Sequence, residues 1–164
     1  MGLLRKTYAE INLKNVRENV NKIINKYKGY NYYFGVVKAD CYGHGYKKTV
    51  QAVIDGGCNY LAVATLEEAI KIRAIYTKIP ILCLGVIDEE FLKICEENNI
   101  TITIGSLSYL KNLKLKDYKK IKVHLKINTG MNRLGISNGS ELEEVVKILK
   151  DNNIICELKE EYKQ

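Results

Sequence analysis

The sequence has 164 residues, of which 46% are hydrophobic, so it can fold as one domain with a sizeable core and does not have the composition of a disordered chain. The formal charge of +7 would attract phosphates in general, but the lysines are spread along the chain. The local cluster 111–120 could be a nucleic-acid patch, yet a solvated connection between a helix and a strand explains it better. We therefore predict no nucleic-acid partner.

No apolar run approaches the roughly 18 residues that a membrane-spanning helix needs. The first residues are not followed by the hydrophobic stretch of a signal peptide, so we expect no membrane partner and a cytoplasmic location. The five cysteines show no paired metal spacing, which predicts reduced, mostly buried thiols and no metal site. Cys41 lies three residues after Lys38, and we expect it to be a spectator there.

In chain order, weak alternation over Thr7–Asn12 predicts a short strand that leads into a helix. Asn12 can cap that helix, whose apolar residues recur at spacings of three and four, and Lys28-Gly29 ends it. A strand ending at Lys38 follows. The remaining expected elements are a helix over 46–54, a strand over 60–64, a helix over 65–76, a strand over 81–84, a helix over 88–97, a strand over 100–104, a helix over 106–113, a strand over 121–127, a helix starting at a 140–143 capping box, and a strand beginning at 154.

Strands that alternate with helices in this way imply a parallel sheet with right-handed crossovers. The strands start every 20 to 30 residues, roughly the repeat of a (β/α) barrel. No Gly-x-Gly-x-x-Gly follows the first strand, so the dinucleotide-binding fold is not predicted. The expected fold is thus α/β, of the (β/α)8 TIM-barrel type.

Lys38 stands out because a β-branched and aromatic run ends on it and a glycine-containing turn follows at once. The ends of strands carry the chemistry in barrels of this kind, and a lysine there can attack a carbonyl group to form a Schiff base. Gly43 and Gly45 allow the backbone to approach a ligand closely. A solvated lysine at a strand end remains the alternative for this pattern taken alone, and His44 is expected to be a loop residue.

The string Val-Val-Lys-Ala-Asp-Cys-Tyr-Gly-His-Gly over 36–45 resembles the pyridoxal-phosphate attachment segment of bacterial alanine racemases. A second string, His-Leu-Lys-Ile-Asn-Thr-Gly-Met-Asn-Arg-Leu-Gly over 124–135, is similar to the other signature of that family. The two motifs stand in the family's order, and the resemblance extends over nearly the whole chain. It implies an isomerase that interconverts L- and D-alanine on pyridoxal 5'-phosphate and thereby supplies D-alanine for the cell wall, as a homodimer.

The resemblance also implies residue roles. Lys38 would hold the cofactor as an aldimine and act as the acid/base on one face of alanine, and Tyr42 would lie near the cofactor phosphate. Arg133 would hydrogen-bond the phenolic oxygen of the cofactor and contact the substrate. Met131 would offer a backbone amide to the substrate carboxylate, and Lys126 would be the lysine that is often carbamylated to orient the arginine.

The family often has an acidic residue where this chain has Asn128, so a local charge differs. Alternation places His124, Lys126 and Asn128 on one face of the expected strand, which suggests the interior of a barrel mouth. For His124 alone, a hydrogen-bonded core histidine is the favoured interpretation.

Alanine racemases run on well beyond the length of this chain, completing eight strands and adding a β-rich C-terminal domain that contains a second catalytic base. We therefore expect residues 1–164 to be the N-terminal part of the barrel domain, with about five to six of the eight strands and a polar end unlike the family's continuation. Two alternatives remain open: a non-catalytic single-barrel protein that binds pyridoxal phosphate, and an inactive fragment.

Overall fold

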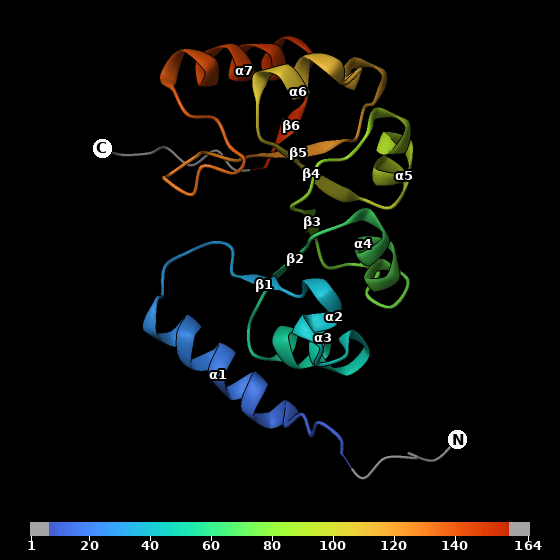
Figure 1. Cartoon of the computed structure of the whole chain (residues 1–164), viewed down its shortest axis with the longest axis vertical. Coiled ribbons are helices and arrows are strands. Elements are labelled where there is room, and N and C mark those ends of the chain that lie inside the picture. Colours follow the sequence, from blue (N-terminus) through green and yellow to red (C-terminus); the bar gives the residue numbers. More distant parts are fainter. Residues whose placement is uncertain (1–6, 158–164) are drawn as a thin grey trace.

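The computed structural model describes residues 7–157, and its centre is a six-stranded sheet in the order β1-β2-β3-β4-β5-β6 (Figure 1). Each strand pairs in parallel with the next one along the chain. This confirms the predicted parallel sheet. The strands are β1 (Phe34–Val36), β2 (Tyr60–Val63), β3 (Ile81–Cys83), β4 (Ile100–Ile104), β5 (Lys122–Leu125) and β6 (Ile155–Cys156).

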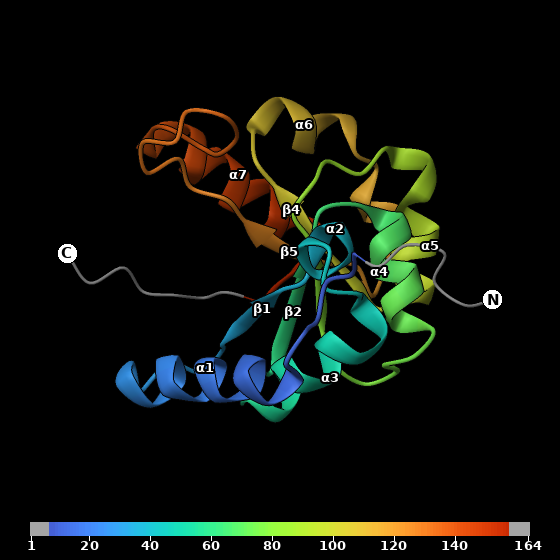
Figure 2. The same ribbon diagram turned by 60° about the horizontal axis from the view of Figure 1, so that its bottom comes forward.

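Helices connect the strands and surround one side of the sheet (Figures 1 and 2). Within the described residues, β1 and β6 each pair with one neighbour, so the curved sheet does not close on itself. The architecture is an incomplete α/β barrel. The helices are α1 (Leu13–Lys26), α2 (Lys38–Tyr42), α3 (Tyr46–Asp55), α4 (Leu66–Arg73), α5 (Leu92–Glu97), α6 (Leu107–Asn112) and α7 (Gly139–Asp151), with short 3₁₀ turns η1 (Glu89–Phe91) and η2 (Leu115–Asp117).

The strands divide their side chains between two layers, as period-two alternation requires. On the outer side, apolar residues such as Leu61, Ile102 and Val123 pack with the helices in the main hydrophobic cluster. On the inner side, Tyr60 and Leu82 belong to a second, smaller cluster, against which Phe34 packs. The inner layer also contains buried polar groups, and these are described below.

Glycine lets β1 and α3 approach closely. A Cβ added to Gly35 would lie 2.4 Å from Val53 Cγ1, and Val53 is buried in the main cluster. The same holds where α1 meets the end of α3, because a Cβ on Gly56 would lie 2.6 Å from Val20 Cβ. The contact at Gly56 lets α1 lie along α3 in Figure 1, although β1 and α2 separate the two helices in the sequence.

Several predicted helix starts are confirmed. Asn12 caps α1 by accepting a hydrogen bond from Asn15 N, and Thr65 and Glu68 form a reciprocal capping box at the start of α4. The capping box predicted at Ser140 is wrong, because Asn138 caps α7 two residues earlier, accepting from Glu141 N at 2.7 Å. Asn has a short side-chain acceptor suited to that position, and Ser140 then falls inside the helix.

Two other expectations need correction near the N-terminus. The lead-in strand is absent from residues 7–12, which pair with no neighbouring strand. The buried face of α1 also contains fewer residues than the apolar spacing predicts. Val16, Val20 and Ile24 pack against the core, but Ile23 and Tyr27, which share the same spacing, are 60% and 53% exposed. The helix meets its neighbour, α3, along one line only.

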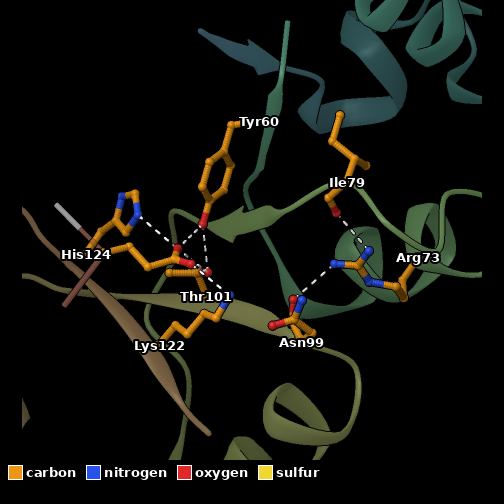
Figure 3. A network of polar contacts seen from close by, with 8 residues as sticks. Tyr60, Arg73, Ile79, Asn99, Thr101, Lys122 and His124 are labelled. Atoms are coloured by element: carbon orange, nitrogen blue, oxygen red, sulfur yellow. Dashed lines mark hydrogen bonds and ion pairs between the residues drawn. The ribbon is translucent and has the colours of Figure 1, made fainter. Parts of the chain in front are cut away.

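A buried arginine joins the loops at the N-terminal edge of the sheet. Arg73, at the end of α4, is 9% exposed, and its guanidinium donates four hydrogen bonds to backbone carbonyls. Two acceptors, Tyr76 O and Ile79 O, lie in the loop before β3, and two, Asn98 O and Asn99 O, lie in the loop before β4. Figure 3 shows Arg73 with Ile79 and Asn99, one acceptor from each loop. Burial lowers the pKa of this guanidinium, but an arginine stays protonated over the physiological range.

Candidate active site

The candidate residues follow the C-terminal ends of two strands, which lie at the same edge because the sheet is parallel. Lys38 comes two residues after β1, and Lys126 comes directly after β5. Met131 and Arg133 lie in the loop 126–138 between β5 and α7. The sheet therefore brings both sequence motifs to one edge.

Lys38 is not the last residue of a strand, which corrects the sequence-based expectation. Strand β1 ends at Val36, and Lys38 opens the short α2, whose next residues Ala39, Asp40 and Cys41 have φ of 50°, 52° and 56°. Tyr42 continues with φ of 56°. Four consecutive non-glycine residues thus form a left-handed turn, although each costs roughly 1–2 kcal/mol relative to the right-handed conformation.

The surroundings of the turn hold this conformation. Asp40 Oδ1 accepts a hydrogen bond from Tyr46 N at 2.7 Å, and Gly45 N donates to Asp40 O at 2.9 Å. Within the turn, Cys41 N donates to Val37 O and Gly43 N donates to Ala39 O. The geometry therefore fixes the backbone on the C-terminal side of Lys38.

Cys41 anchors the turn in the core. Its side chain is buried, and burial, reinforced by Asp40 and Glu68, raises the pKa of the thiol to about 11. A thiol that stays protonated is a poor nucleophile and a poor metal ligand. Within residues 7–157, no group of three or more His, Cys, Asp or Glu side chains is arranged to hold a metal ion.

Asn128 organises the loop 126–138. Its Oδ1 accepts hydrogen bonds from Gly130 N at 3.1 Å and Asn132 N at 3.0 Å, while its Nδ2 donates to Asn132 Oδ1 and Ser137 Oγ. The loop is closed at its base, because Asn128 N donates to Ile136 O at 2.9 Å. The amide uses both of its ends, so the residue shapes the loop and adds no charge.

The side chains of the other candidate residues form no hydrogen bonds of this kind within the described residues. Tyr42 and Met131 are 60% and 70% exposed, Arg133 is exposed, and Lys38 and Lys126 are half-buried. Within the described part of the chain, none of their side chains has a hydrogen bond or an ion pair. His44 is an exposed loop residue, as expected.

A second polar group, which the sequence did not reveal, lies on the inner face of the sheet. Glu157 Oε2 accepts hydrogen bonds from Tyr60 Oη at 2.5 Å and from Thr101 Oγ1 at 3.0 Å, and Lys122 Nζ lies 2.9 Å from Glu157 Oε1. Figure 3 shows Tyr60, Thr101 and Lys122 converging from three different strands. Burial alone would raise the pKa of Glu157, but the hydrogen bonds from Tyr60 and Lys122 outweigh it and lower the pKa.

His124 belongs to this inner group on the inner face of the sheet. It is 4% exposed, its ring meets those of Phe34 and Tyr60 edge-on, and Nε2 lies 3.4 Å from Glu157 Oε2 without forming a hydrogen bond. Burial lowers the pKa of the imidazole, and the nearby Glu157 opposes that shift. His124 is therefore a core histidine, but Nε2 lacks the hydrogen bond that we expected.

The comparison with protein families decides the relationship. The family model described as "Alanine racemase, N-terminal domain" matches residues 11–159, which is most of the chain. The chain belongs to this family. Both sequence motifs and the whole sheet lie inside the matched region.

Curated proteins of the alanine racemase family agree. Alanine racemase 1 of Bacillus subtilis is 40% identical over 149 residues, which cover 90% of this chain and 38% of that protein. The alanine racemase of Clostridium kluyveri is 41% identical over 154 residues, which cover 92% of this chain and 39% of that protein. The chain thus spans about 40% of the length of the alanine racemases that it matches.

Solved alanine racemases share the fold as well. The structure of the Clostridium difficile alanine racemase superposes with a TM-score of 0.82 at 34% identity, covering 95% of this chain and 42% of that one. The Enterococcus faecalis enzyme gives 0.81 at 29% identity, covering 90% and 41%. The incomplete barrel is therefore the fold of the first part of these racemase structures.

No helix in the described residues 7–157 has the length and apolar character needed to span a bilayer.

Proposed function

We propose that residues 1–164 form the N-terminal part of the barrel domain of an alanine racemase, which interconverts L- and D-alanine with pyridoxal 5'-phosphate. The supporting observation is that Lys38 and the loop 126–138 follow the C-terminal ends of parallel strands in one sheet. In barrel enzymes this edge carries the active site. The matched relatives are named alanine racemases, which favours this reaction over other uses of a barrel lysine.

The side chains at this edge fit the cofactor chemically. Within residues 7–157 the amines of Lys38 and Lys126, the guanidinium of Arg133 and the hydroxyl of Tyr42 have no hydrogen bond or ion pair. A primary amine can bond covalently to the aldehyde of pyridoxal phosphate, and cationic and hydroxyl donors suit a phosphate or a phenolic oxygen. Polar groups that would compete, such as those of Asp40 and Asn128, are occupied by backbone amides.

In this proposal Lys38 Nζ holds the cofactor and, once the amino acid has replaced it, takes or returns the proton at Cα on one face. The bound cofactor supplies an electron sink for the charge that develops at Cα. Arg133 donates to the phenolic oxygen and contacts the substrate, and Tyr42 lies by the phosphate. The backbone amide of Met131 meets the substrate carboxylate, and a carbamylated Lys126 orients Arg133.

The proposal extends to the setting of the whole protein. By analogy with its relatives, the enzyme is a cytoplasmic homodimer that supplies D-alanine for peptidoglycan. A racemase must move a proton on both faces of Cα, and this edge offers Lys38 for one face. We therefore expect the 164-residue chain, tested alone, to form D-alanine about 10²–10⁴-fold more slowly than a two-base racemase.

The test combines trapping and turnover. The chain is incubated with pyridoxal phosphate, reduced with borohydride, digested and mapped by mass spectrometry. We expect the label on Lys38 and its loss in Lys38→Ala, with Lys48→Ala, an exposed lysine of α3, as the matched control. A label on another lysine with Lys38 unmodified would overturn the assignment.

A coupled assay for D-alanine then separates racemase from binder. Slow D-alanine formation that disappears in Lys38→Ala supports the racemase. Complete labelling of Lys38 with no D-alanine above the Lys38→Ala blank would instead favour a protein that binds pyridoxal phosphate without catalysis. Turnover of about one per second or faster would refute the need for a second base.

A further inference from the structure

Glu68 connects the turn that carries Lys38 to the next strand of the sheet. The first amide after Lys38, Ala39 N, donates a hydrogen bond to Glu68 Oε1 at 2.7 Å. The other oxygen, Oε2, accepts from Ala64 N at 2.8 Å and from Thr65 N at 3.4 Å, where β2 ends and α4 begins. One carboxylate therefore joins the C-terminal ends of two neighbouring strands.

This contact does more than the capping of α4 requires. A capping box needs the glutamate to reach the amide of the N-cap residue, which is Thr65 here. The shortest of the three hydrogen bonds goes instead to Ala39, which lies 29 residues away in another β/α unit. Because the acceptor is ionised, this bond is about twice as strong as one between neutral groups.

The position of the bond matters because the backbone conformation changes at this point. Val37 has φ of −119° and ψ of 21°, and Ala39 has φ of 50° and ψ of 50°, so φ changes sign across Lys38 and the chain enters the left-handed region. Within residues 7–157, the Ala39 amide donates its one hydrogen bond to Glu68. This bond acts directly on the peptide that follows Lys38, whereas the hydrogen bonds within the turn act on later amides.

We propose that Glu68 is a positioning residue for Lys38, because its carboxylate fixes the peptide between Lys38 and Ala39 and so sets the direction in which the lysine side chain leaves the strand. The inference rests on the proposed function in one respect, that Lys38 is the lysine that holds the cofactor. Glu68 acts through the backbone and does not need to touch the cofactor or the substrate.

The test compares Glu68→Gln with two matched controls from the same helix. The glutamine keeps the shape but can present only one oxygen, so an N–H group of Ala39 or of Ala64 must face its amino group. Glu67→Gln removes the same charge one residue away at an exposed position. Thr65→Ala removes the other half of the capping box and leaves the carboxylate on Ala39.

The first readout is the rate of borohydride-trapped labelling of Lys38 by pyridoxal phosphate, together with the pH profile of the visible absorbance of the bound cofactor. We expect Glu68→Gln to slow labelling at least fivefold and to shift the profile, while both controls stay within twofold of the parent chain. Labelling by Glu68→Gln at the parental rate overturns the inference. So does an equal loss in Thr65→Ala, because capping would then explain the effect.

The second readout does not depend on the cofactor. Hydrogen exchange is followed at the amides of Cys41 and Gly43, which bond within the turn and not to Glu68. We expect at least tenfold faster exchange in Glu68→Gln and no change in either control. If the parent chain fails to bind pyridoxal phosphate, the proposed function fails, yet this arm still decides the role of Glu68: unchanged exchange would refute it. Should Glu68→Gln not fold by circular dichroism, Glu68→Asp, one methylene shorter, takes its place.

Discussion

The buried guanidinium of Arg73 should contribute strongly to the stability of the folded chain. Its guanidinium is 9% exposed and donates to four backbone carbonyls at 2.8–3.0 Å, in two loops that are distant in the sequence. No ion pair involves it within residues 7–157. The charge is compensated by carbonyl dipoles, two of which, Asn98 O and Asn99 O, lie where α5 ends and the helix dipole is negative.

The size of the effect follows from two opposing contributions. Hydrogen bonds to a charged group contribute about 1.5–3 kcal/mol each, so four amount to roughly 6–12 kcal/mol. Burying one ion costs several kcal/mol in the folded state, which offsets a large part of this. We therefore expect Arg73→Met to lower the free energy of unfolding by about 2–5 kcal/mol, a large share of the roughly 5–15 kcal/mol typical of native proteins.

The assay is thermal unfolding followed by circular dichroism on the full chain. A loss of this size lowers the melting temperature by on the order of 10 °C for a protein of this length. Arg73→Lys should fall between the parent and Arg73→Met, because an ammonium has three donors on one nitrogen and cannot span both loops. Arg17→Met, at an exposed position on α1, is the control and should melt with the parent.

Two results would refute this reasoning. If Arg73→Met melted within about 2 °C of the parent, the hydrogen bonds would contribute no more than the desolvation of the ion costs. If Arg73→Lys matched the parent while Arg73→Met did not, the charge alone would matter and the four-carbonyl geometry would not.

Two further predictions concern the sheet. Folding lowers the pKa of Glu157, so its contribution to stability is present above the ordinary glutamate range and is lost as the pH falls through the folded value. The melting temperature of the parent should therefore drop more steeply below pH 5 than that of Glu157→Gln. Parallel curves for the two proteins would contradict this. His124, whose pKa is also lowered, adds a loss that begins as the pH falls below about 6.5 in both proteins. Gly35→Ala should cost about 1–3 kcal/mol in urea unfolding, because its Cβ would clash with a buried valine, whereas Gly139→Ala, with nothing within 4 Å, should not destabilise the chain.

The sequence was sufficient for the parallel sheet and its order of elements because each strand is a short apolar run bounded by clear helix starts. The expected bounds of β4, 100–104, agree with the structure, as do the caps at Asn12 and Thr65. The cap of α7 was misplaced because Asn138 and Ser140 stand two residues apart, and local spacing alone does not decide between two good capping residues. The helix itself was still located.

The backbone conformation after Lys38 could not be predicted from sequence patterns. Positive φ is normally indicated by glycine, so Gly43 and Gly45 predicted a turn. The turn in fact begins four residues earlier, at Ala39, in a residue type that rarely adopts this conformation. Hydrogen bonds within the turn hold it together with a contact to Glu68, which comes from another β/α unit. The burial of Arg73 was likewise not predictable from the sequence, because an arginine at the end of a helix is usually solvated and interacts with the helix dipole.

The inner polar group was missed for a related reason. Glu157 follows Cys156 at what reads as the polar end of a short strand, and nothing in the sequence pairs it with residues 35 to 97 positions away. The site residues themselves, Lys38, Tyr42, Lys126, Met131 and Arg133, came from the resemblance to a family and stay predictions until the labelling experiment is done. The structure adds where they lie and which neighbours shape their loops.

The edge that bears the proposed site is held together by the same kind of contact twice. Glu68 is the third residue of α4 and accepts from Ala39 N, in the unit before it; Glu141 is the third residue of α7 and accepts from Leu107 N at 2.9 Å, at the start of α6. The loop 126–138 is also tied to its neighbour, since Gly135 N donates to Gly105 O at 3.1 Å. Each loop is thus positioned by the adjacent unit as well as by its own strand. Because a displacement of about 1 Å can cost on the order of 10² in rate, substitutions at these glutamates should impair chemistry at Lys38 and Arg133 without touching either residue.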